Sequence, residues 1–148
     1  MADQTAASAR DAINNAYASY LAELKLAAPH WERKPEGAAA GEAAWCARQV
    51  VEHIAGAAVF FGAGIAGQIN VQGPQMQQAQ IPDAADAVSV TETNQAAFMS
   101  VANQVTDAQM GHEFEHPRLG KQTVAGILGL VAHHLGDHAN QLKTLRGG

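Results

Sequence analysis

Residues 116–142 read HPRLGKQTVAGILGLVAHHLGDHANQL, and this stretch decides the fold class. Its apolar residues recur on one side of a helix when they are placed at about 100° per residue, which predicts an amphipathic helix over residues 123–145. His134 and His138 are four residues apart and lie one turn apart on that apolar side, whereas His133 points about 100° away from it. The sequence therefore predicts a long helix that directs two histidines into the core.

Three further helices are expected upstream, over residues 5–27, 42–70 and 84–106. In the last of these, Asp83 follows Pro82 as the expected N-cap. No stretch alternates with a period of two for long enough to predict a strand. The sequence therefore predicts an all-α fold, a four-helix bundle formed by one domain over residues 1–148. The long links at 28–41 and 107–122 leave room for a connection that crosses the bundle.

The charge distribution argues against a nucleic-acid partner. The net charge is −5, and the nine Lys and Arg residues are dispersed rather than clustered. A protein that binds a duplex normally neutralises several phosphates with grouped basic residues. We therefore expect no nucleic-acid binding and a small molecule as the partner.

We also expect a cytoplasmic protein that does not enter a membrane. The N-terminus is polar and lacks the apolar segment of a secretory signal. The apolar stretch at 54–67 is shorter than the roughly 20 residues that span a bilayer, so it predicts a buried helix. Cys46 is the single cysteine, which excludes an internal disulfide and suits a reducing compartment.

A third histidine also faces the predicted core. His53 shares a helical stripe with Val50, Ala57 and Phe60. Three inward imidazoles without partners would carry buried polar nitrogens at a cost of about 1–3 kcal/mol each. A His pair at i, i+4 is a standard seat for a metal ion. We therefore take His53, His134 and His138 as metal ligands, with hydrogen-bonded core histidines as the alternative.

Two motifs resemble those of the DinB/YfiT superfamily. The C-terminal stretch is similar to a family signature in which a Pro-x-x-Gly-x-x-Thr entry leads to a helix with His-x-x-x-His and then Gln-Leu. Here Pro117, Gly120 and Thr123 form the entry, and the helix carries His134, His138, Gln141 and Leu142. The segment WCARQVVEHIAG resembles the second-helix motif, in which Trp45 precedes His53 by eight residues.

The resemblance implies a four-helix bundle that holds one divalent metal on these three histidines and is often dimeric. Some relatives are thiol transferases that use bacillithiol, mycothiol or glutathione, and many have no established reaction. The resemblance thus implies a divalent metal cofactor, together with a low-molecular-weight thiol if the chain shares that activity.

Other polar residues near these motifs have two interpretations each. Asp137 is a candidate to orient a ligand histidine from behind, and a surface pairing with His133 is the alternative. Cys46 lies seven residues before His53, about 10 Å along a helix, and is expected to be a small buried side chain. His112 and His116 are either proton shuttles near the bundle mouth or solvated surface residues.

Two classes of function follow from an open site with three His ligands. Such a site suits Zn, Ni or Fe and leaves a coordination position for water, a thiol or a substrate. The first hypothesis is a metal-dependent thiol S-transferase or hydrolase acting on a small electrophile. The alternative is a non-catalytic, stress-related module that binds a metal or a ligand. A carboxylate and a pocket beside the metal would favour the enzyme, and a sealed site would favour the module.

A homodimer is expected as well. Charged residues make up only 16% of the chain, which is low for a helical protein. The Gly- and Ala-rich stretch at 62–67 offers a surface for close helix packing.

Overall fold

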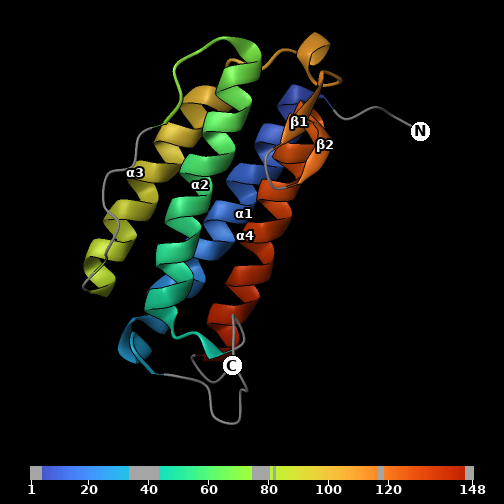
Figure 1. The fold of residues 1–148 in the computed structure, drawn as a ribbon. Helices are drawn as coiled ribbons and strands as arrows, with labels where there is room; N and C mark the ends of the chain where they lie inside the picture. Colours follow the sequence, from blue (N-terminus) through green and yellow to red (C-terminus); the bar gives the residue numbers. More distant parts are fainter. Residues whose placement is uncertain (1–4, 34–43, 75–80, 82, 117–118, 146–148) are drawn as a thin grey trace.

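The computed structural model describes residues 5–33, 44–74, 81, 83–116 and 119–145, and it shows a bundle of long helices (Figure 1). α1 packs against α3 and α4, and α2 packs against the same two helices. The all-α fold predicted from the sequence is thus confirmed. In the described residues the long helices are α1 (Ala6–Ala27), α2 (Ala47–Ile69), α3 (Ala84–Ala102) and α4 (Val124–Leu145), with short 3-10 turns η1 (Ala28–His30) and η3 (Asp107–Gln109).

Local sequence signals set the ends of these helices. Thr5 is the N-cap of α1, where its side chain accepts a hydrogen bond from the backbone N–H of Ser8. Asp83 caps α3 as predicted, accepting from the backbone N–H of Asp86. α2 ends at Asn70, which adopts the left-handed conformation (φ 59°) that Asn tolerates better than most residues.

Two predicted boundaries were wrong. Within the described residues α2 begins at Ala47 rather than near residue 42, since Trp45 and Cys46 are not helical. α3 ends at Ala102 rather than near residue 106. Arg10 of α1 donates hydrogen bonds to the carbonyl groups of Ala102 and Val105, which satisfies backbone acceptors at this helix end.

The chain direction places the long crossing connection between α2 and α3. α1 and α3 are antiparallel, because Arg10 contacts Ala102 while Asn14 contacts Gln95. α2 and α3 run in the same direction, so the end of α2 and the start of α3 lie at opposite ends of the bundle (Figure 1). The longer links at 28–41 and 107–122 do not make this crossing, contrary to expectation.

A small antiparallel hairpin precedes α4, although no strand was predicted. It pairs β1 (Glu113–His116) with β2 (Gly120–Thr123) in the register Glu113 to Thr123 and His116 to Gly120. Gly120 has φ 74°, a left-handed conformation that a residue with a Cβ rarely adopts. Four-residue strands are too short to show a period of two, so the sequence pattern did not reveal them.

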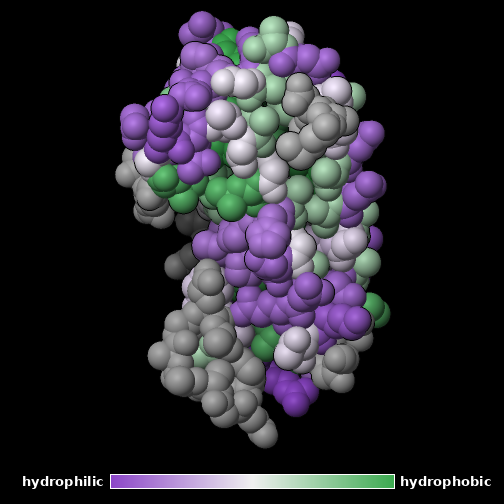
Figure 2. Space-filling model, turned by 90° about the vertical axis from the view of Figure 1, so that its right-hand side faces the viewer, coloured by the Kyte–Doolittle hydropathy of each residue, from purple (hydrophilic) through white to green (hydrophobic). Residues whose placement is uncertain are grey.

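Among the described residues, α2 is the helix that is long and apolar enough to cross a membrane, judged by length and composition alone. Its buried positions, from Val50 to Ile69, pack into the bundle core, as those of a core helix do. On the face seen in Figure 2, hydrophobic residues lie in small areas between hydrophilic ones. α2 is therefore a core helix of the bundle, as the sequence predicted.

Candidate metal centre

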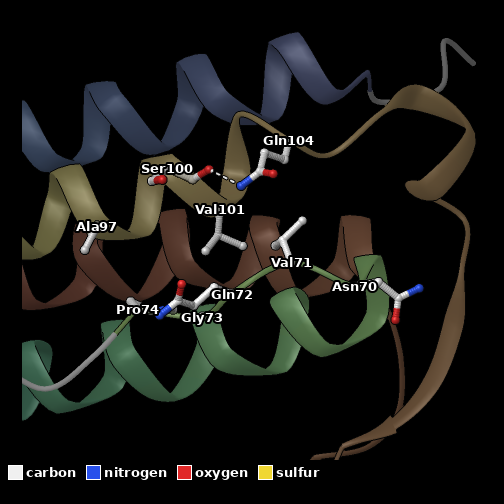
Figure 3. A pocket seen from close by; sticks show the side chains of 9 residues that line it. All are labelled: Asn70, Val71, Gln72, Gly73, Pro74, Ala97, Ser100, Val101 and Gln104. Atoms are coloured by element: carbon white, nitrogen blue, oxygen red, sulfur yellow. Dashed lines mark hydrogen bonds between the residues drawn. The ribbon is translucent and has the colours of Figure 1, made fainter.

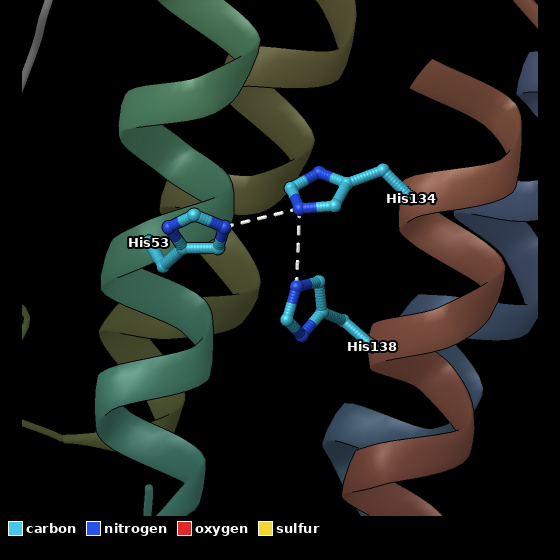
Figure 4. Close-up of side chains that lie close together, drawn as sticks. All are labelled: His53, His134 and His138. Carbon is cyan, nitrogen blue, oxygen red and sulfur yellow. Dashed lines mark hydrogen bonds between the residues drawn. The ribbon is translucent and has the colours of Figure 1, made fainter. Parts of the chain in front are cut away.

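Three imidazoles from two helices converge in the bundle. His53 comes from α2, and His134 and His138 come from successive turns of α4 (Figure 4). The Nε2 atom of His134 lies 3.0 Å from that of His53 and 3.1 Å from that of His138. His138 is buried, and the other two rings are partly exposed. The geometry brings together the three residues that the sequence singled out, and His133 lies outside this cluster.

The spacing of these nitrogens fits a metal ion. Bonds of about 2.0–2.1 Å at a tetrahedral angle separate neighbouring ligand nitrogens by roughly 3.3 Å. The two measured separations of 3.0 and 3.1 Å are within about 0.3 Å of that value, and all three ligand atoms lie within 4.8 Å of one another. The three ligand atoms are therefore near enough to one another to hold one divalent ion between them.

A neighbouring amide sets the tautomer of one ligand. Nδ1 of His138 lies 2.7 Å from Oε1 of Gln141, one turn further along α4. The amide oxygen can only accept, so Nδ1 carries the proton and Nε2 presents its lone pair to the cluster. This is the protonation pattern that metal coordination through Nε2 requires. The sequence analysis placed Gln141 in the motif of this helix but did not assign it a role, and the structure places it in contact with His138.

Trp45 covers one side of the cluster. Its ring lies 5.0 Å from that of His53 and is nearly parallel to that of His138 at 6.3 Å between centroids. An aromatic wall restricts both imidazoles to a narrow range of orientations. Trp45, just before α2, is therefore part of the wall around the three histidines.

The core side of the cluster is closed. His134 lines a cavity of about 10 Å³ with Tyr17 and Ile54, a space no larger than one water molecule. Burial raises the pKa of Tyr17 well above its usual range, so this neighbour stays uncharged. Ligands that reach His134 must therefore approach from another direction.

A larger cavity also has His134 in its wall. It measures about 530 Å³, which is within the range of small-molecule sites. His53 and His134 form part of its wall. Most of the rest is apolar, and the remaining lining residues are Glu52, Gly56, Ala57, Phe60, Phe61 and Leu119.

Glu52 is the carboxylate of this cavity, although its predicted direction was away from His53. Its Oε2 accepts from the backbone N–H of Ile81 at 2.8 Å and from Arg48 Nε at 3.4 Å. Ion pairing with Glu32 and, to a smaller extent, with Glu52 raises the pKa of Arg48. The contacts of Glu52 within the described part of the chain use only Oε2.

Asp137 lies on the surface rather than behind the ligands. Its Oδ2 is 3.2 Å from Nε2 of His133, and both side chains are more than half exposed. This is the surface pairing considered as the alternative. Asp137 was predicted to orient a ligand histidine, and the residue that contacts a candidate ligand in this way is Gln141, at His138.

The two histidines before α4 differ in environment. His112 is exposed, and its Nε2 lies 3.0 Å from Oε1 of Gln68. His116 is buried, packs against Phe60 at 4.8 Å, and accepts a hydrogen bond at Nδ1 from the backbone N–H of Leu119. His116 therefore fixes Leu119 at the cavity rather than lying in solvent.

Cys46 takes no part in the cluster. It is buried at the N-cap of α2, where its backbone N–H donates to Oε1 of Gln49. The group of candidate ligands within the described residues consists of the three histidines alone.

A second groove lies between the end of α2 and α3, with a volume of about 580 Å³ (Figure 3). Its polar side chains are the amides Asn70, Gln72 and Gln104 and the hydroxyl of Ser100. None of its lining residues titrates near neutral pH. The acid–base and metal-ligating groups are instead at the histidine cavity.

Comparison with known proteins agrees with this geometry. No curated protein and no solved structure matched the chain significantly. The family model of the DinB superfamily matches residues 9–142, which include most of α1, all of α2 and α3, the hairpin, and α4 as far as Leu142. With nearly its whole length covered by that match and three histidines placed to hold a metal, the chain belongs to the DinB superfamily.

Proposed function

We propose that this protein is a metal-dependent enzyme that promotes attack by a small thiol or by water on a small organic electrophile. The observation that carries the proposal is the convergence of three Nε2 atoms at the wall of an open cavity that also contains a carboxylate. His53, His134 and His138 would hold the ion. A bound divalent ion at such a site lowers the pKa of a thiol or water that it binds.

Residues around the three histidines would position the metal ligands and the electrophile, and would exclude water from the site. Gln141 orients His138, and Trp45 packs against two of the ligands. Phe60 and Phe61 form an apolar surface for the electrophile next to His134. Glu52 lines the same cavity and is the candidate to accept a proton from a nucleophile or to orient it.

The alternative is a metal- or ligand-binding module without catalysis. One observation favours it over a transferase that uses glutathione or bacillithiol: no Lys or Arg is among the described residues that line the cavity. Carboxylates of such a cofactor would have no cationic partner there. Lys121 is paired with Glu113, and Arg118 lies outside the described residues. We propose the cytoplasm as its location, where thiols remain reduced.

One experiment separates these candidates. Purified protein should carry about one divalent ion by elemental analysis, His134→Ala should lose most of it, and His133→Ala should retain it, since His133 faces solvent. Metal-loaded protein is then incubated with chlorodinitrobenzene and each of bacillithiol, mycothiol, glutathione and coenzyme A, and with an activated ester for hydrolysis.

The enzyme proposal predicts turnover by the wild type and by His133→Ala, and background rates for His134→Ala. Metal binding without any difference in rate among the three proteins would leave the module as the better account. Absence of bound metal, together with no rise in melting temperature on adding Zn or Ni, would exclude both metal-based functions.

A further inference from the structure

We propose that the histidine cavity selects ligands that have an apolar body and a free end that is either uncharged or positively charged. Glu52 is the residue that selects the charge of the free end. The inference rests on the proposed function, because it assumes that the donor atom of the ligand binds the metal. It specifies the substrate class that the proposed function leaves open.

The shape and composition of the wall favour an apolar body. Phe60 and Phe61 lie with ring centroids 5.7 Å apart at 64°, and both line the cavity. Gly56 and Ala57 are small enough to leave room on the α2 face. Leu119 forms the wall on the hairpin side and is held there by the hydrogen bond from its backbone N–H to His116. Burial of an apolar group against this surface stabilises the complex by about 25 cal/mol per Å².

The charge of the wall disfavours an anionic free end. Glu52 is the acidic residue among the described lining residues, and none of them is basic. Arg48 is the cation nearest to Glu52 in the ion-pair network, but it is shared between Glu32 at 3.0 Å and Glu52 at 3.4 Å. Glu32, Arg48 and Glu52 together carry a net charge of −1, and Glu52, which lines the cavity, acts on the free end of the ligand in addition to the charge of the bound ion.

Two hydrogen bonds fix the position of the Glu52 carboxylate, so that it can discriminate between ligands by their charge. The backbone N–H of Ile81 and the guanidinium of Arg48 both bind Oε2. Oε1 is not engaged by any described residue and remains able to accept from a donor on the ligand. A fixed acceptor favours an ammonium or N–H group and rejects a carboxylate.

The test uses cobalt(II)-loaded protein and three ligands with the same metal-binding head: 4-propylimidazole, N,N,N-trimethylhistamine, whose quaternary nitrogen cannot bind the metal, and imidazole-4-propionate. Their free ends are neutral, cationic and anionic, and binding is followed by the visible absorption of cobalt. The wild type should bind the anionic ligand about tenfold more weakly than the other two. Glu52→Gln should remove most of that difference, whereas Glu52→Asp should preserve it.

Glu92→Gln is the matched control, since Glu92 is exposed on α3, and it should leave all three affinities unchanged. Equal affinities of the three ligands for the wild type would overturn the inference while leaving the metal centre intact. The inference would also be overturned if Glu52→Gln changed the affinities for all three ligands by the same factor. Failure to bind cobalt at all would instead show that the proposed function is wrong.

Discussion

His138 illustrates how a single hydrogen bond prepares a ligand. Its Nδ1 donates to Gln141, and this leaves Nε2 free of a proton on the side of His134 and His53. Three imidazole lone pairs aimed at one point would repel each other without a cation between them. The tautomer inferred for His138 therefore adds support for metal binding to that given by the presence of three histidines.

Replacing Gln141 should weaken metal binding without abolishing it. Loss of a hydrogen bond behind a metal ligand typically costs about 10- to 100-fold in affinity, so Gln141→Ala should fall in that range. Gln141→Glu should bind zinc at least as well as the wild type, because its carboxylate also accepts from Nδ1. Competition with a chelator of known affinity measures the effect.

The control for this series is Asn140→Ala, since Asn140 is exposed on the next position of α4. Its zinc affinity should equal that of the wild type. An unchanged affinity in Gln141→Ala would show that Gln141 does not orient His138.

At the scale of elements, the glycines of α2 differ in what surrounds them. A Cβ on Gly62 would lie 2.6 Å from Cγ of Pro74 and 3.3 Å from a ring atom of Phe98, whereas a Cβ on Gly67 would meet nothing within 4 Å. Gly62 thus permits close packing of the connection after α2 and of α3, while Gly67 only lowers helix propensity.

Substituting these two glycines should change stability in opposite directions. Gly62→Ala should reduce the free energy of unfolding by about 1–3 kcal/mol, because the rigid Pro74 ring must shift. Gly67→Ala should increase it by about 0.5–1 kcal/mol through helix propensity. Urea denaturation of both variants checks the pair, and a stabilised Gly62→Ala would mean that Pro74 does not pack against Gly62 as described.

The hairpin before α4 shows how a short element can serve the site. Its register places His116 opposite Gly120, and His116 is buried against Phe60 and binds the backbone of Leu119. The hairpin therefore builds one wall of the cavity. Its strands were missed in the sequence because pairing of two four-residue segments depends on their contacts with each other.

At the scale of the whole molecule, we propose a homodimer. The low charge content and the exposed apolar side chains Leu26 and Leu119 leave surface that a second copy would cover. Light scattering at micromolar protein should give a mass near twice 15.5 kDa. A mass near 15.5 kDa across that concentration range would contradict the proposal.

The sequence by itself determined the helices of the bundle and the inward direction of His53, His134 and His138. Those properties depend on a repeat of 3.6 residues and on caps such as Thr5 and Asp83, which are local. His53 and His134 could thus be assigned to inward faces although 81 positions separate them.

Only the tertiary structure decided that the three Nε2 atoms meet, that Glu52 lines a cavity and that Gln141 rather than Asp137 contacts His138. It also decided that α2 and α3 run parallel. These features depend on the rotation and height of α2 relative to α4, to within about 1 Å, and on side-chain rotamers. A helical pattern determines which face is apolar, but the packing of distant helices sets how far one face lies from another.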